Sequence, residues 1–249
     1  MTRLSVNLNK VALLRNSRNI GIPSLIRAAE QSIAASAHGI TVHPRPDQRH
    51  IRTSDVYDLA SHLKSFPDVE FNIEGNPYPE FLEMVRKVTP AQCTLVPDGP
   101  DAVTSDHGWD LEQEGERLRG VITELQSLGA RVSLFMDADS NQWEIARELG
   151  ADRVELYTQP YAEAFARGDC KDILAKYAAA TTAAQSARLG VNAGHDLNLQ
   201  NLGRFCQIPG ILEVSIGHAL VADALEMGFS NAVRAYFKVL ERSLSRGTA

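Results

Sequence analysis

Eight short apolar runs, separated by amphipathic stretches, constrain the fold of this chain more than any other feature. Each run is rich in Val, Ile, Leu or Phe, which is typical of strands buried on both faces of a sheet. The intervals between the runs are long enough to hold a helix each. The runs are Leu4–Leu8, Gly39–Val42, Val69–Ile73, Cys93–Val96, Arg131–Met136, Arg153–Leu156, Gly190–Asn192 and Glu213–Ile216.

The stretches between the runs have the periodicity of helices. Leu118, Val121, Ile122 and Leu125, for example, follow the spacing i, i+3, i+4, i+7. Strands that alternate with helices form parallel sheets through right-handed crossovers, and no GxGxxG follows the first run to suggest an open dinucleotide-binding sheet. We therefore expect one domain over residues 1–249, an α/β fold of the (β/α)₈ TIM-barrel type. The long interval 157–189 predicts an additional short helix.

Composition excludes several other classes of protein. The formal net charge is −6 and there is no basic run, which argues against general nucleic-acid binding. The chain has three cysteines and no CxxC spacing, so a disulfide framework or a structural zinc site is not expected. The segment MTRLSVNLNK lacks the apolar core of a signal peptide, and no stretch approaches the roughly 18 apolar residues of a membrane span. We expect a cytoplasmic protein with neither nucleic-acid nor membrane partners.

Polar residues follow the apolar runs at the point where each strand ends. In barrels of this type the active site lies at the C-terminal ends of the strands. Four of the seven histidines, His43, His50, His195 and His218, occupy such positions. The opposite ends show mainly glycine, alanine and small turns. This asymmetry predicts a functional site at the C-terminal ends.

Two of these strand ends carry candidate acid–base groups. His43 is followed by Arg45, Arg49 and His50 in a proline-containing loop, which suits an acid–base histidine beside anion-binding groups. A capping histidine in a solvated basic loop is the alternative. Glu74 ends the third run before a glycine, and burial there would raise its pKa and suit it to accept a proton. An ion pair with a neighbouring arginine is the alternative for Glu74.

The seventh and eighth strand ends share a Gly-His pair before a helix, at His195 and at His218. Glycine lets a ligand approach the backbone, helix N-termini attract anions, and barrels often hold phosphate in these two loops. The alternative is a pair of tight turns.

Two further segments have more than one interpretation. The polar loop 97–109 is either a lid over the site or an ordinary surface loop. Asp137 and Asp139 resemble a metal-binding pair, but companion ligands are not evident, so we expect no metal. Asp137 is more readily interpreted as a group that orients a histidine or caps the next helix.

Seven segments together carry a resemblance to a known family over nearly the whole chain. In this order and spacing they resemble the pyridoxine 5′-phosphate synthase family of vitamin B6 biosynthesis. The segments are Val6–Arg18, Gly39–Ile51, Phe71–Glu74, Leu95–Asp106, Arg131–Asp139, Val191–His195 and Ser215–Leu220.

The resemblance implies a TIM barrel that condenses 1-deoxy-D-xylulose 5-phosphate with 3-amino-2-oxopropyl phosphate. The products are pyridoxine 5′-phosphate, phosphate and water, and neither a metal nor an organic cofactor is needed. The resemblance also implies a homo-oligomer, an octamer built from dimers, for which the predicted long helix from Ala219 toward Leu244 offers a candidate surface.

Site residues follow from the same resemblance. His43 and Glu74 match proton acceptors, and His195 matches the proton donor. Two substrate-binding sets are implied. Asn7, Arg18, Asp196, Gly217 and His218 match positions that hold the aminoketone phosphate, and Arg45, His50 and Thr104 match positions that hold the sugar phosphate. Asp196 stands where the family usually has glycine, so we expect a backbone contact there.

The main departure from the family pattern lies at Asn9 and Lys10, where Asp-His is common and contacts the sugar phosphate. Asn9 cannot act as a carboxylate base, and Lys10 carries a flexible charge. This opening is a variant within the family, so we keep both residues as substrate-binding candidates. Two other hypotheses stay open. One is a different barrel enzyme, such as an epimerase or an aldolase with an imine at Lys10, and the other is a non-catalytic sensor of phosphorylated ligands.

Overall fold

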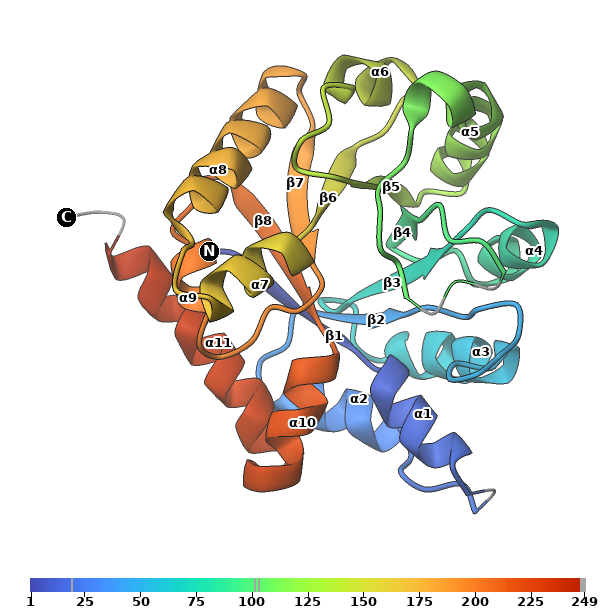
Figure 1. Ribbon diagram of the computed structural model, residues 1–249. Helices are drawn as coiled ribbons and strands as arrows, with labels where there is room; N and C mark the ends of the chain where they lie inside the picture. The colour runs from blue at the N-terminus through green and yellow to red at the C-terminus, as the bar shows by residue number, and fades with distance from the viewer. Residues whose placement is uncertain (19, 101, 103, 247–249) are drawn as a thin grey trace.

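The eight predicted strands form one closed barrel of parallel strands in the order β1 to β8 (Figure 1). The computed structural model describes residues 1–18, 20–100, 102 and 104–246. β1 pairs with both β2 and β8, which closes the sheet. The strands are β1 (Arg3–Asn7), β2 (Gly39–Val42), β3 (Glu70–Gly75), β4 (Gln92–Leu95), β5 (Arg131–Met136), β6 (Arg153–Tyr157), β7 (Gly190–Gly194) and β8 (Ile211–Ile216).

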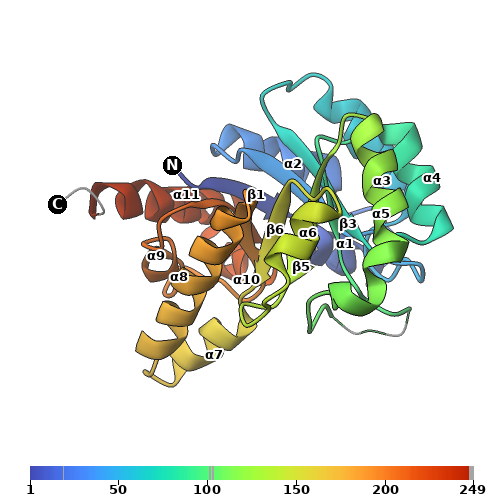
Figure 2. The ribbon, with the colours of Figure 1, turned by 90° about the horizontal axis from the view of Figure 1, so that it is seen from above.

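Helices surround the barrel on its outer side (Figures 1 and 2). Apolar side chains from the strands, such as Leu4, Val6, Ile40 and Ile73, are fully buried in one core cluster with those of the helices. The predicted additional helix before β7 is present as α7. The helices are α1 (Asn9–Asn16), α2 (Leu25–Ala34), α3 (Thr53–Leu63), α4 (Pro79–Val88), α5 (Leu111–Ser127), α6 (Trp143–Glu148), α7 (Gln159–Ala166), α8 (Lys171–Ser186), α9 (Leu202–Phe205), α10 (His218–Met227) and α11 (Phe229–Arg246).

The prediction of one long helix from Ala219 toward Leu244 was wrong. Gly228 has a φ of 81°, which ends α10 and allows the chain to turn into α11. The two helices then pack against each other, and the Tyr236 hydroxyl donates to Asp223 Oδ2 at 2.7 Å. In the described part of the chain, no helix combines the length and the apolar character that crossing a membrane requires.

Small polar side chains of neighbouring strands hydrogen-bond to one another across the first half of the barrel. Ser5 and Thr41 share a hydrogen bond of 2.6 Å, Asn72 donates to Thr41 at 3.3 Å, and Thr94 donates to Asn72 at 3.2 Å. All four side chains are buried. Because each has a partner, the barrel tolerates them at little net cost.

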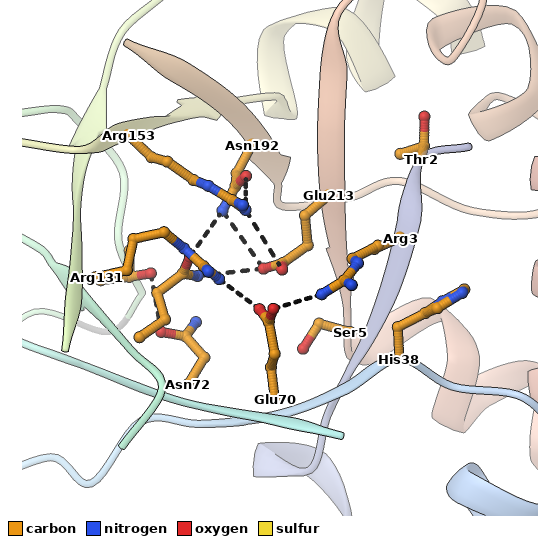
Figure 3. Close-up of polar contacts among 12 residues, drawn as sticks. Thr2, Arg3, Ser5, His38, Glu70, Asn72, Arg131, Arg153, Asn192 and Glu213 are labelled. Atoms are coloured by element: carbon orange, nitrogen blue, oxygen red, sulfur yellow. Dashed lines mark hydrogen bonds and ion pairs between the residues drawn. The ribbon is translucent and has the colours of Figure 1, made fainter. Parts of the chain in front are cut away.

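The N-terminal ends of the strands carry a charged cluster, where the sequence showed mainly glycine, alanine and small turns (Figure 3). Glu70 accepts from both Arg3 and Arg131, and Arg131 also donates to Gln92 at 2.8 Å. Gln92 in turn donates to Glu213 at 3.2 Å. Arg3, Glu70, Gln92 and Arg131 each begin a strand, so their hydrophobic neighbours concealed the cluster in the sequence. The cluster lies at the end of the barrel opposite the candidate site.

We expect Glu70→Gln to lower the free energy of unfolding by roughly 2 kcal/mol at pH 7, because two arginines lose a charged partner. The Arg131 hydrogen bond and charge hold the pKa of Glu70 below its ordinary 4.5 despite partial burial. Its stabilising effect is therefore present above pH 4.5 and is lost as the pH falls further. Denaturant unfolding at pH 7 and pH 3 measures both values, and an equal loss at the two pH values would contradict this role.

Candidate active site

A cavity of about 700 Å³ opens at the C-terminal ends of the strands. Twelve of the thirteen predicted site residues line it. They come from β1, β2, β3, β7, β8 and the loops that follow these strands and β4. The twelve are Asn7, Asn9, Lys10, His43, Arg45, His50, Glu74, Thr104, His195, Asp196, Gly217 and His218.

Arg18 is the predicted residue that does not line the cavity. It lies in the turn after α1, where its backbone N–H donates to the carbonyl of Arg15 and its side chain is exposed. Its assignment to the aminoketone phosphate rests on the resemblance alone.

Two buried carboxylates, Glu74 and Glu155, line the cavity. Burial, with the charges of Asp98 and Glu213, raises the pKa of Glu74 to about 8. Burial and the charge of Glu74 raise the pKa of Glu155 well above its ordinary value. Two carboxyl groups that both favour the protonated form near neutral pH are suited to exchange protons with a ligand.

Glu155 was not among the predicted site residues, although a glutamate in the apolar run RVELY was a signal for it. Its Oε2 atom has no hydrogen-bond partner among the described residues. Gly194 on the neighbouring strand makes room for the carboxylate, because a Cβ there would lie 2.3 Å from Glu155 Oε1. A buried carboxylate oxygen without a partner is available to a ligand in the cavity.

The β1 and β2 part of the cavity wall is basic and contains two neutral histidines. Burial and the charge of Arg45 hold the pKa of His43 well below 6.5. Burial, Arg45 and Lys10 lower the pKa of His50 to about 4. An imidazole that is neutral at pH 7 has a free ring nitrogen, so His43 can accept a proton.

Asn9 makes structural hydrogen bonds at the end of β1, although it lacks the carboxylate that is common at this position. Its Oδ1 atom accepts the backbone N–H of His43 at 2.9 Å, and its own N–H donates to Asn7 Oδ1 at 2.9 Å. An amide oxygen thus supplies the acceptor that an aspartate would supply. Lys10 adds a positive charge to the same wall, which suits an anionic ligand.

Arg45 connects the basic wall to the loop after β4. The guanidinium pairs with buried Asp98 and donates to the Ala102 carbonyl at 2.8 Å, while the Ser105 hydroxyl donates to Asp98 at 2.7 Å. Residues 101 and 103 of the predicted lid lie outside the described residues, so closure stays a prediction. Thr104, on this loop, lines the cavity.

Asp137 and Asp139 bind different partners and do not form a metal-binding pair. Asp137 accepts the backbone N–H of Gly108 at 3.0 Å, so it holds the end of the loop 97–109 rather than a histidine or the next helix. Asp139 forms an ion pair with Lys176 at 2.8 Å. Within the described ranges, no three His, Cys, Asp or Glu side chains are placed together as metal ligands.

The seventh strand end holds His195 in an unusual backbone conformation, with a φ of 80°. Its ring packs against the rings of Phe135 and Tyr157, with centroids 5.0 and 5.5 Å away. Burial, followed by the charge of Arg45, lowers the pKa of His195 to about 4. The imidazole is therefore neutral at pH 7, where it can donate a hydrogen bond and relay a proton.

The eighth strand end brings a helix N-terminus to the cavity. Gly217 precedes α10, and His218 is the first residue of that helix. A Cβ at Gly217 would lie 3.2 Å from Asn7 Cβ, so glycine permits the close approach of β8 and β1. The N-terminus of a helix, with its unpaired N–H groups, is suited to hold an anion.

Comparisons with known proteins identify the family of the chain. A model of the family described as pyridoxal phosphate biosynthesis protein PdxJ matches residues 4–242. Proteins named pyridoxine 5′-phosphate synthase are 53% identical in Albidiferax ferrireducens, over 98% of this chain and 99% of theirs, and 53% identical in Xanthomonas axonopodis pv. citri, over 96% of each.

A solved structure, 3-keto-L-gulonate-6-phosphate decarboxylase from Vibrio cholerae, superposes with a TM-score of 0.65 at 10% identity, over 97% of this chain and 98% of that one. At so low an identity, this likeness bears on the fold and confirms the TIM barrel. The family model and the near full-length relatives go further, and together they show that the chain belongs to the PdxJ family.

Proposed function

We propose that this protein is a pyridoxine 5′-phosphate synthase that joins 1-deoxy-D-xylulose 5-phosphate to 3-amino-2-oxopropyl phosphate. The observation that carries the proposal is the 53% identity to proteins of that name over nearly the full length of both chains. The cavity supports it, because it gathers acid–base groups and two anion-binding walls in one space.

The proposed chemistry requires several proton transfers in one pocket. The amine of one substrate adds to the ketone of the other, and dehydration, phosphate elimination and ring closure follow. We assign proton acceptance to the neutral imidazole of His43 and to the ionised form of Glu74, and proton donation to His195. All three side chains line the cavity. The substrate brings the amine, so an imine at Lys10 is not needed.

The two phosphates are assigned to different walls. Lys10, Arg45, His50 and Thr104 lie on the β1, β2 and β4 side, where positive charge suits the sugar phosphate. Asn7, Asp196, Gly217 and His218 lie on the β1, β7 and β8 side, where backbone N–H groups suit the aminoketone phosphate. Two phosphate-binding sites of this kind hold the substrates in the orientation that the condensation needs.

The direct test mixes the purified protein with both substrates and follows pyridoxine 5′-phosphate by mass spectrometry and phosphate release. We expect both products in equal amounts. Binding of both substrates without product would instead identify a ligand sensor. Trapping of Lys10 by borohydride, with product of another kind, would identify an aldolase-type enzyme.

We also propose a homo-oligomer, as the family resemblance implies. Apolar side chains are exposed on α1 and on the segment after it, including Leu14, Ile20 and Ile22, at 49%, 56% and 64%. Leu225 on α10, which packs beside α1, is 78% exposed. Several exposed apolar side chains on adjoining elements are typical of a protein–protein interface, and Arg18 lies in the same region.

We expect the Leu14→Glu, Ile22→Glu double variant to sediment as a smaller species than the unaltered protein, because two charges would be buried in the contact. Analytical ultracentrifugation measures this change. Leu212→Glu is the control, because Leu212 is 41% exposed but lies on β8, and it should leave the sedimentation unchanged. An unaltered protein that sediments as a monomer would refute the proposal.

A further inference from the structure

The chain adopts a left-handed backbone at two successive residues in the wall of the cavity. His195 has a φ of 80° and Asp196 a φ of 58°, and neither is glycine. Such conformations are uncommon for residues with a Cβ and persist where surrounding contacts enforce them. The contacts that enforce this one are therefore informative.

Thr158 fixes the peptide groups on both sides of His195. Its hydroxyl lies 2.5 Å from the carbonyl oxygen of Gly194 and also within hydrogen-bonding distance of the carbonyl oxygen of His195. Its backbone N–H donates to the Gly194 carbonyl at 2.9 Å. Because the two peptide planes that flank His195 define its φ and ψ, one fully buried side chain constrains both angles.

Asn201 fixes the next peptide group in the same way. Its side-chain amide donates to the Asp196 carbonyl at 3.1 Å, and its Oδ1 atom accepts the backbone N–H of Asn198 at 2.8 Å. The Tyr161 hydroxyl donates to the Asn201 carbonyl at 2.7 Å. Asn201 is 1% exposed, so it is a buried anchor rather than a surface group.

The carbonyl groups of Gly194, His195 and Asp196 therefore all point to buried anchors. In a trans peptide the N–H points opposite to the C=O, so the N–H groups of the three following residues, His195, Asp196 and Leu197, point the other way. These three residues line the cavity, and no described residue accepts a hydrogen bond from their N–H groups. Successive N–H groups on one side of a turn form an anion-binding nest.

The same segment sets the direction of the His195 ring. Phe135 and Tyr157 pack edge-on against it, with interplanar angles of 63° and 77°. Tyr157 immediately precedes Thr158, so the end of β6 contacts both the ring and the backbone of His195. A change at Thr158 should thus move the imidazole and the N–H groups together.

We propose that Thr158 and Asn201 are positioning residues that hold the segment 195–197 in its left-handed form, so that one arrangement both orients His195 and presents three N–H groups to a phosphate. The proposal rests on the proposed function for the identity of that phosphate, the one on 3-amino-2-oxopropyl phosphate. Neither side chain lines the cavity. The two buried side chains would nevertheless control both proton transfer and substrate affinity.

The test compares three threonine variants. Thr158→Val removes the hydroxyl and keeps the shape, and Thr158→Ser restores a hydroxyl. Thr181→Val is the matched control, because the Thr181 hydroxyl is also buried and donates to a carbonyl, that of Tyr177 at 2.8 Å, away from the cavity. Any loss shared by the two valine variants reflects the loss of a buried hydroxyl in general.

Steady-state kinetics of the variants should show different effects on the KM values of the two substrates. We expect Thr158→Val to lower kcat at least about tenfold and to raise the KM for the aminoketone phosphate about tenfold. The KM for the sugar phosphate should stay within about twofold, because the Lys10 wall is unaltered. Thr158→Ser should recover most of both losses, and Thr181→Val should show neither.

A binding experiment tests the positioning role of Thr158 independently of the proposed function. Calorimetric titration with inorganic phosphate, in the presence of saturating 1-deoxy-D-xylulose 5-phosphate, reports on the 195–197 segment without turnover. We expect Thr158→Val to weaken this binding about tenfold and Thr158→Ser to restore it. If Thr158→Val binds phosphate as Thr181→Val does, the positioning role is refuted, whatever product the enzyme makes.

Discussion

Glu74→Gln is expected to lower kcat by about 10²–10⁴-fold, because the amide cannot take up a proton while it fills the same space. Glu74 accepts a weak hydrogen bond of 3.4 Å from Asn7 and lines the cavity beside Glu155. The measurement is steady-state formation of pyridoxine 5′-phosphate. Glu213→Gln is the control, since Glu213 is also buried with a raised pKa but lies at the other end of the barrel. That variant should keep kcat within a few-fold, and equal losses would remove Glu74 from the proposed mechanism.

The pH dependence follows from the pKa of about 8 for Glu74. At pH 7 only about a tenth of the enzyme carries the ionised carboxylate that accepts a proton, so kcat/KM should rise roughly tenfold per pH unit below pH 8 and level off above it. Glu74→Gln should abolish this rise. A flat profile between pH 6 and pH 8 in the unaltered enzyme would contradict the assignment.

The same substitution is expected to stabilise the fold at neutral and higher pH. The pKa of Glu74 is raised from 4.5 to about 8 on folding, so the free energy of unfolding falls as the pH rises through this interval. The shift corresponds to roughly 3 kcal/mol at pH 7 and roughly 4 kcal/mol at pH 8. Glu74→Gln should thus gain stability at pH 8 and gain almost none near pH 4.5, as urea unfolding at the two pH values will show.

Gly108→Ala is expected to give the largest loss of stability among the glycine substitutions. A Cβ at Gly108 would lie 2.4 Å from the backbone nitrogen of Asp137 and 2.5 Å from the Cα of Met136. These are backbone atoms of β5 and its end, so the loop 97–109 must move away and release the Gly108 bond to Asp137. Overpacking of this kind costs about 3 kcal/mol, or about 6–12 °C in Tm.

Gly120→Ala provides the matched comparison. Gly120 lies within α5, and no atom is within 4 Å of the position that its Cβ would take. Alanine there should raise the free energy of unfolding by about 0.5–1 kcal/mol through helix propensity. Calorimetry of the two variants should show opposite signs, and a Gly108→Ala protein as stable as the parent would refute the close packing of the loop on β5.

The strands, and the end of the barrel at which the candidate site residues gather, were predictable because their signals are local. A run such as Leu4–Leu8 is recognisable from its own residues, and His43 and His195 come soon after the runs that position them. Contacts between distant residues were not predictable. The proximity of Glu155 to Glu74 and the charged cluster of Glu70, Arg131 and Glu213 are produced by the barrel, and the pattern of a single sequence does not record such partners.

Backbone conformation was the other source of error. Gly228 divides a stretch with continuous helical character into α10 and α11, because its positive φ depends on how α11 packs. At Asp196 the sequence led us to expect a backbone contact but not the backbone conformation. Its φ is 58°, a conformation that aspartate tolerates better than most residues.

Closure of the barrel by β1 and β8 has a consequence for how the protein matures during synthesis. Asn7 and Gly217, which approach each other in the cavity wall, are separated by almost the whole chain, so the pocket does not exist until the last strand has left the ribosome and paired with the first. Contacts of such long sequence separation form slowly. Every shorter nascent chain lacks the β8 part of the pocket and has two unpaired strand edges. The rate at which activity returns during refolding should therefore report the pairing of β1 with β8. The rate at which the circular-dichroism signal of the helices returns should not.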